Sequence, residues 1–263
     1  ALEAINPRAV ENGLRLSTIL RDDGSLLDSI AAARIADAQV RLDHPLEFLV
    51  AGCEVRLSAD RLRHSQASIV RRGVRLIAAA MGASPNFAQC QAVADAIHRG
   101  GHAAITFEGG SVVAEADGVA LKIRKLEHIP PYRQPLTVPG ETICDDLGWS
   151  IAAWPSNDEP GKARRSLRAM VDSAKLSGSL YARPFKPGDR VQPLGARSES
   201  KVQDLLTNAH VSAEMKKRLP IICDMIGPIW IPTVCIAERA KVSMGAGARL
   251  NLELRDCREV EAV

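Results

Sequence analysis

The sequence changes pattern near His102. Before that point, apolar residues recur every three or four positions, as they do along one face of a helix, for example between Ser65 and Met81. After it, β-forming residues alternate around turn signals such as Asp117-Gly118, a pair that is typical of two-residue hairpins. The pattern predicts an α+β protein with a helical domain over residues 1–101 and a β-rich α/β domain over residues 102–263.

Short signals in the first hundred residues mark where helices start and stop. Asn6 followed by Pro7 predicts the N-cap of a long first helix, and Gly24 is expected to interrupt it because glycine weakens a helix. Ser84 is the expected N-cap of a later helix, which Gly100-Gly101 should end.

The last third predicts short elements. Ser200, with Gln203 three residues later, predicts a helix that starts with a capping box, and a second short helix is expected from Ser212 to Pro220. The segments "IIC" and "IWI" predict a hairpin, and "RLNLELR" from Arg249 alternates like a terminal strand.

Composition excludes several classes of protein. The longest apolar runs are broken by charge well before the roughly 20 residues that a membrane helix needs, so no membrane partner is expected. The 6 cysteines are scattered without a C-x-x-C pair, which predicts free thiols in a cytoplasmic protein and neither a metal site nor a disulfide. The chain begins "ALEAINPR", without Met or a signal peptide, which indicates a piece of a longer protein.

No catalytic motif stands out. The sequence contains no phosphate-binding loop, and Gly245-Ala246-Gly247 is too short for a dinucleotide fingerprint. Asp145-Asp146 is interpreted as a solvated acidic pair because neighbouring residues point in different directions. The sequence therefore predicts no catalytic, cofactor-binding or metal-binding residue in this chain.

Basic residues gather in three segments, although the net charge is only +3. Several Lys or Arg on one face can neutralise RNA phosphates, whereas a solvated rim is the alternative interpretation. The predicted RNA-binding residues are Arg183, Lys186, Arg190 and Lys201 in one segment, Lys216, Lys217 and Arg218 in the next, and Arg71, Arg72 and Arg75 in the amphipathic helix.

Residues 180–232, "LYARPFKPGDRVQPLGARSESKVQDLLTNAHVSAEMKKRLPIICDMIGPIWIP", resemble the C-terminal domain of tRNA(Ile)-lysidine synthase. The shared pattern is an Arg, a Pro-Gly-Asp-Arg turn, a Pro-Leu-Gly step, a Lys-led helix, a Leu-Pro pair and a Trp-bearing strand. Upstream, "INPRAVENGLRLSTILRDDGSLLDSIA" and "RHSQASIVRRGVRLIAAAMG" resemble the helical substrate-binding region of the family. The chain departs from the family at Asn208–Ala213 and at Cys235, where basic residues are common.

The resemblance implies a ligase of tRNA modification. Members of this family use ATP to adenylate C2 of the wobble cytidine in an isoleucine tRNA with a CAU anticodon, and free lysine then displaces AMP to leave lysidine. Decoding changes from AUG to AUA. The resemblance places ATP and Mg in an N-terminal domain with an S-G-G-x-D-S loop, and this chain has no such loop. It therefore implies that the chain is the tRNA-binding portion, inactive alone, with the acceptor stem as its target.

Two other interpretations stay open from the residues. A stand-alone RNA-binding module would use the same basic side chains without any enzymatic partner. A structural or dimerising domain would use the same helices and sheet to contact a second copy of the chain.

Overall fold

The computed structural model describes residues 8–41, 43–157, 166–243 and 248–258. They form two compact units: unit 1 takes the described residues up to 41 together with 52–127, and unit 2 takes 43–51 together with those from 128 onward. Both units combine helices with sheet, so the predicted α+β class is confirmed. None of the helices within these ranges is long and apolar enough to cross a bilayer.

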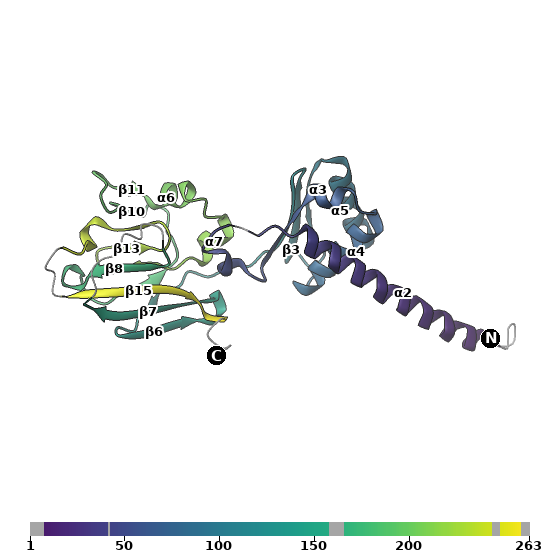
Figure 1. The fold of residues 1–263 in the computed structure, drawn as a ribbon, viewed down its shortest axis with the longest axis horizontal. Coiled ribbons are helices and arrows are strands. Elements are labelled where there is room, and N and C mark those ends of the chain that lie inside the picture. The colour runs from purple at the N-terminus through teal and green to yellow at the C-terminus, as the bar shows by residue number, and fades with distance from the viewer. Residues whose placement is uncertain (1–7, 42, 158–165, 244–247, 259–263) are drawn as a thin grey trace. The chain divides into compact units, whose positions relative to one another are not determined.

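Unit 1 places helices against an antiparallel sheet of four strands in the order β1-β4-β3-β2 (Figure 1). Its described elements are α2 (Ala9–Ala38), β1 (Glu54–Ser58), α3 (Ala59–Arg63), α4 (Ala67–Ala80), α5 (Phe87–Arg99), β2 (His102–Thr106), β3 (Val112–Asp117) and β4 (Ala120–Lys125).

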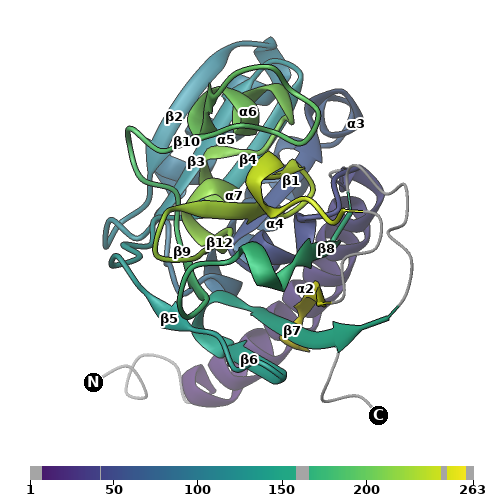
Figure 2. The same ribbon diagram turned by 90° about the vertical axis from the view of Figure 1, so that its left-hand side faces the viewer.

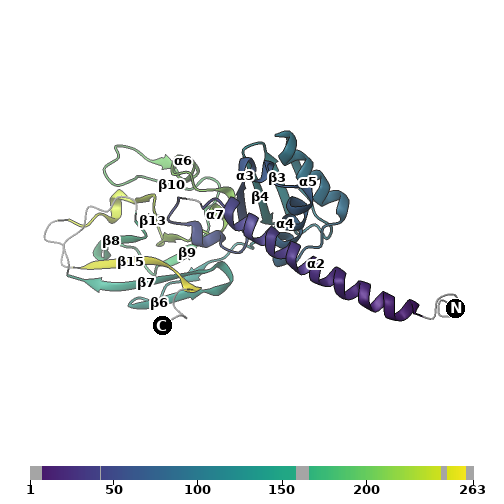
Figure 3. The same cartoon turned by 45° about the vertical axis from the view of Figure 1, so that its right-hand side comes forward.

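The first helix of unit 1 is continuous. α2 runs through Gly24, so the predicted interruption there is wrong. A Cβ at Gly73 of α4 would lie 2.9 Å from Ile35 Cδ1 of α2, so the missing side chain lets the two helices approach closely. The N-terminal part of α2 extends away from α3, α4 and α5 (Figure 3). Asn6 and Pro7 lie outside the described residues.

The core of unit 1 crosses the boundary that the sequence predicts at residue 101. Leu121 and Ile123 of β4 are buried with Val70 and Val74 of α4, because the apolar face of the sheet covers the apolar faces of the helices. β1 is a strand inside the region predicted to be helical, and it pairs with β4. The strands after residue 101 therefore complete the first unit instead of starting the second.

Two local glycine signals in unit 1, a helix stop and a hairpin turn, are confirmed. α5 ends at Gly100, which adopts the left-handed φ of 65° that favours glycine, as predicted. The β3–β4 hairpin turns at Gly118, whose φ is 81°. The N-cap of α5 is Asn86, not Ser84, and a capping box with Gln89 satisfies the first backbone amides.

The described residues of unit 2 form three sheets with the strand orders β14-β13-β12-β9-β5, β6-β7-β15-β8 and β10-β11. Its described strands are β5 (Gln134–Pro135), β6 (Gly140–Cys144), β7 (Trp149–Ser156), β8 (Arg168–Asp172), β9 (Tyr181–Arg183), β10 (Arg190–Val191), β11 (Ser200–Lys201), β12 (Ile221–Cys223), β13 (Pro228–Ile231), β14 (Cys235–Ile236) and β15 (Arg249–Asp256). Its described helices are η1 (Glu47–Val50), η2 (Asp145–Leu147), η3 (Ser173–Lys175), α6 (Val202–Asn208), α7 (Ala213–Arg218) and η4 (Glu238–Ala240).

The core of unit 2 lies between its two larger sheets. Trp149 and Ile151 of β7 are buried together with Ile222 of β12 and Trp230 of β13. β6 and β7 run side by side (Figure 2). The predicted β12–β13 hairpin and the predicted terminal strand, β15, are both confirmed. The predicted turn at Gly245 to Gly247 falls outside the described residues.

All six cysteines are free, and Cys90, Cys223 and Cys257 are buried. Burial raises the pKa of Cys223 to about 11, so this thiol stays protonated at neutral pH. Asp145 and Asp146 form the short helix η2 together with Leu147.

Candidate nucleic-acid interface

The Pro-Gly turn of unit 2 has a type II form. The amide of Asp189 donates to the carbonyl of Lys186 at 3.1 Å, and Gly188 at the third position has a φ of 91°. Pro187 fits the second position because its ring fixes the required φ. The turn therefore follows directly from the sequence Lys-Pro-Gly-Asp.

Arg183 is an internal support of this turn. Its side chain is 8% exposed, and its guanidinium donates to both carboxylate oxygens of Asp189 at 2.7 and 2.8 Å. The same carboxylate accepts the backbone amide of Lys186 at 2.8 Å. The expectation that Arg183 belongs to an exposed basic rim is therefore corrected: its donors are used inside the protein, where a lone charge would be costly.

The other three predicted cations of this segment are exposed. Lys186 lies in the turn, and Arg190 of β10 is the cross-strand partner of Lys201 of β11. Like charges in such a pair repel each other unless an anion lies between them. Glu199 offsets part of this charge through a 3.3 Å contact with Arg190, but both side chains are more than half exposed and the pair is weak. We call Lys186, Arg190 and Lys201 the hairpin rim.

Backbone contacts join the elements that carry the hairpin rim, and Figure 1 shows β10, β11 and α6 next to one another. The amide of Val202 donates to the carbonyl of Asp189 at 2.9 Å, which joins the start of α6 to the Pro-Gly turn. Lys201 itself is the N-cap of α6, and its side chain makes no capping bond, so the predicted capping box from Ser200 is wrong. The Pro-Leu-Gly loop is anchored at 2.6 Å by the amide of Gly195 donating to Glu238 Oε2.

The three basic residues of α7 do not form one surface. The helix predicted from Ser212 is confirmed, and Ser212 caps it by accepting from the amide of Met215. Lys216 donates to Thr207 Oγ1 at 2.9 Å, and Lys217 pairs with Glu214 at 2.9 Å. Arg218 is 3% exposed, so it is a buried side chain and the predicted role on the surface is corrected.

A second buried ion pair of unit 2 was not identified from the sequence. Arg239 donates to both oxygens of Asp224 at 2.7 Å. Burial opposes ionisation of this carboxyl, but the hydrogen bonds from Arg239, Ser177 and Gly227 outweigh it and lower the pKa of Asp224 to about 2. The two partners are fifteen residues apart and carry no common motif, so only the tertiary structure reveals the pair.

The predicted arginines of unit 1 lie together on α4. Arg71, Arg72 and Arg75 line one pocket, so the structure brings all three to a common concave surface. A further cation of unit 2, Arg133, lies 3.9 Å from the ring centroid of Tyr181, next to β9. Arg133 has no basic neighbour in the sequence, and the β5–β9 pairing brings it to this position.

Comparisons with known proteins match a segment of the second unit. Residues 180–252 match the family model described as the TilS substrate C-terminal domain. A tRNA(Ile)-lysidine synthase of Symbiobacterium thermophilum is 30% identical over 123 residues, which are 46% of this chain and 25% of that protein. A tRNA(Ile)-lysidine synthase of Bacillus cereus is 29% identical over 109 residues, 41% of this chain and 22% of that protein.

A solved structure, "Crystal structure of TILS C-terminal domain", aligns with 22% identity and a TM-score of 0.45, covering 49% of this chain and 98% of that one. The matched segment spans about a quarter of the length of the curated relatives. Within that segment, the predicted resemblance to the C-terminal domain of tRNA(Ile)-lysidine synthase is confirmed.

Proposed function

We propose that this chain is the tRNA-binding portion of a tRNA(Ile)-lysidine synthase, the ligase that attaches lysine to C2 of the wobble cytidine in an isoleucine tRNA with a CAU anticodon. One observation carries the proposal: the exposed hairpin rim lies within residues 180–252, the segment that matches the TilS substrate C-terminal domain. The corresponding place of action is the cytoplasm, where tRNA is modified.

The chemistry of the hairpin rim suits tRNA phosphates. Ammonium and guanidinium groups on exposed backbone-anchored elements attract phosphate oxygens and release counterions when they bind. Such contacts position a nucleic acid without reading its bases. The resemblance to the synthase domain implies that the rim holds the acceptor stem of the tRNA, while other parts of the enzyme select the anticodon.

The resemblance implies that ATP, Mg and free lysine bind in the N-terminal domain of the synthase. We propose that the chain alone does not form lysidine. Incubation with ATP, lysine and isoleucine tRNA should release no AMP, and AMP release by the purified chain would contradict this assignment.

The test of the hairpin rim is a double substitution, Arg190→Ala with Lys201→Ala. Filter binding should show weaker retention of cognate and non-cognate tRNA alike, and the slope of log K against log salt should flatten by up to about two units. The control is Arg34→Ala with Arg99→Ala, which removes two exposed, ion-paired arginines of unit 1. Unchanged affinity and unchanged salt slope in the Arg190/Lys201 variant would contradict the proposal.

Self-association is the second candidate, and α2 supports it. Large aliphatic side chains at helical spacing are exposed along this helix: Leu16, Ile19, Leu20, Leu26, Leu27 and Ile30. An apolar stripe of this kind on a helix typically packs against another protein surface. Sedimentation equilibrium should then show a dimer that Leu20→Glu converts to a monomer, whereas a monomeric parent chain would exclude this candidate.

A further inference from the structure

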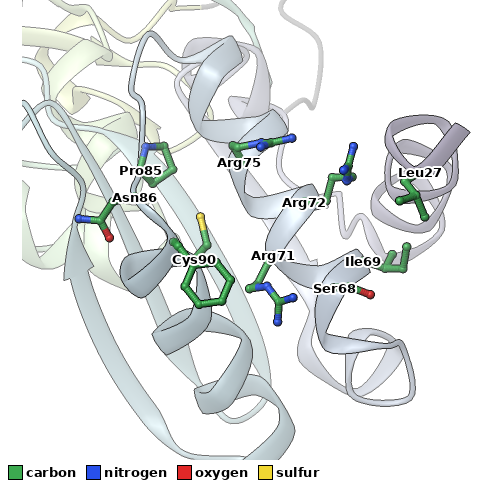
Figure 4. A pocket seen from close by; sticks show the side chains of 10 residues that line it. Leu27, Ser68, Ile69, Arg71, Arg72, Arg75, Pro85, Asn86 and Cys90 are labelled. Carbon is green, nitrogen blue, oxygen red and sulfur yellow. The ribbon is translucent and has the colours of Figure 1, made fainter. Parts of the chain in front are cut away.

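The pocket on α4 is lined by three arginines whose positive charge is only partly balanced by contacts within unit 1. It has a volume of about 320 Å³ and lies between α2 and the start of α5. Figure 4 shows Arg71, Arg72 and Arg75 projecting from α4, with Leu27 on one side and Asn86 and Cys90 on the other. Three guanidinium groups within five residues of one helix repel each other, so they require compensation.

Only part of this positive charge is compensated within unit 1. Arg72 is held by the carbonyl of Gly24 and by Asp28 Oδ1, both at 2.8 Å. Arg75 reaches the same carboxylate only at 3.8 Å, and its side chain is 55% exposed. Arg71 donates at 2.7 Å to the neutral amide oxygen of Gln91. Asp28 thus pairs with Arg72 and weakly with Arg75, while the described partners of Arg71 are a neutral amide and an aromatic ring. A concave surface strengthens the resulting positive potential.

An exposed aromatic ring lies at the same pocket. Phe87, the first residue of α5, is 70% exposed, and the guanidinium of Arg71 lies 5.0 Å from its ring centroid. A large apolar side chain in water is unfavourable, whereas a flat ring beside cations is the arrangement on which single-stranded nucleic acids stack their bases. The Cys90 thiol in the pocket lining is neutral, because burial raises its pKa more strongly than Arg75 and Arg71 lower it.

We propose that this pocket binds one unpaired nucleotide of an RNA strand, with its phosphate between Arg71 and Arg75 and its base against Phe87. The proposal rests on the proposed RNA-binding function but assigns a different site in a different unit. Bases of a double helix stack on each other and cannot reach a ring in a pocket, so the geometry selects a loop, a bulge or an end. Arg72, tied to α2, positions the pocket wall.

The probe is the pentanucleotide rU5 carrying fluorescein at its 3′ end, titrated with the full chain by anisotropy. Arg71→Gln with Arg75→Gln should weaken binding about tenfold or more and flatten the salt slope by about 0.7, as expected when one phosphate of a single strand is no longer neutralised. Phe87→Leu should weaken binding about fivefold or more and leave the salt slope unchanged, because stacking involves no counterion.

Matched control variants change the same kinds of side chain, two arginines or one exposed apolar residue, at positions of unit 1 outside the pocket. Arg34→Gln with Arg99→Gln deletes two exposed arginines outside the pocket, and Val119→Ala shortens an exposed apolar side chain. Both should retain the parent affinity for rU5. Circular dichroism melts of every variant identify any loss of binding that comes from unfolding; for a variant that unfolds, Arg75→Gln alone replaces the double substitution.

Three results would overturn the inference. The first is an Arg71/Arg75 variant that binds rU5 as tightly as its control. The second is competition by AMP as effective as unlabelled rU5, which would mean a free-nucleotide site. The third is tight binding of a blunt RNA duplex that is insensitive to Phe87→Leu, which would mean a flat phosphate surface. The proposed function is tested separately, because the Arg190/Lys201 variant probes tRNA retention by unit 2.

Discussion

The hairpin of unit 2 and helix α4 of unit 1 both concentrate basic residues, but the two regions use them differently. In the hairpin, Arg183 is enclosed with Asp189, a partner only six residues away, and the remaining cations are exposed. On α4, all three arginines line one pocket, and Asp28, the carboxylate that pairs with Arg72 and Arg75, comes from another helix. The difference shows that charge density along the sequence does not separate arginines that support the fold from arginines that are exposed. Partner position and burial separate them.

The largest expected effect is that of Arg183→Ala. Its removal leaves the Asp189 carboxylate in an enclosed site without its cation, so unit 2 should lose about 3–5 kcal/mol of unfolding free energy. Urea denaturation followed by tryptophan fluorescence reports on this unit, because Trp149, Trp154 and Trp230 all belong to it. Arg190→Ala and Lys201→Ala are the controls and should cost less than about 0.5 kcal/mol each. If Arg183→Ala costs no more than these, its structural role is refuted.

Asp224→Asn should give the next largest effect and adds a pH test of the buried pairs. Near pH 7 it should cost about 2–3 kcal/mol, because Arg239 loses its charged partner. The native pKa of about 2 lies below the ordinary value of 3.8, so this stabilisation is present above pH 4 and is lost as pH falls toward 2.

The measurement for Asp224 is the difference in unfolding free energy between parent and variant across this pH range. The difference should narrow as the pH falls from about 4 to 2, because the parent carboxyl then takes up a proton. A difference that stays constant down to pH 2 would show that the carboxylate is not preferentially stabilised in the folded state.

The smallest of these effects should come from Arg72→Gln on α4. It removes a charged hydrogen bond to Asp28 and one to the Gly24 carbonyl in a half-exposed setting, so about 1 kcal/mol should be lost. Hydrogen exchange of the backbone amides of α2 and α4 measures this local stability. Arg75→Gln, whose contact with Asp28 is 3.8 Å long, should change exchange much less. Equal effects of both substitutions would remove the distinction between a supporting and a binding arginine on α4.

Several elements were predictable because their causes lie within a few residues. The amphipathic pattern of α4, the Gly100 stop of α5, the Ser212 cap of α7 and the Pro-Gly turn before Asp189 all follow from local backbone and side-chain chemistry. The segment that resembles the synthase domain was also readable, because order and spacing of short motifs are properties of the chain itself.

Features that depend on distant partners were not predictable. The strand β1 lies in a helical context and exists because β4 offers it a pairing edge seventy residues later along the chain. The strands β2 to β4 belong with the helices because both bury side chains in the same apolar core. Unit 1 therefore ends at residue 127, whereas the sequence pattern predicts a boundary at residue 101.

The sequence alone determined the α+β class, the turns at Gly118 and Gly188, the helix stop at Gly100, and the resemblance of residues 180–232 to the synthase domain. Only the tertiary structure decided that Arg183 and Arg218 are enclosed while Arg190 and Lys201 are exposed, and that the α4 arginines meet Phe87 at one pocket. The physical reason is the range of the interactions. Turns and helix caps are settled by neighbours along the chain, whereas the burial of a charge depends on a partner and a core that other segments supply.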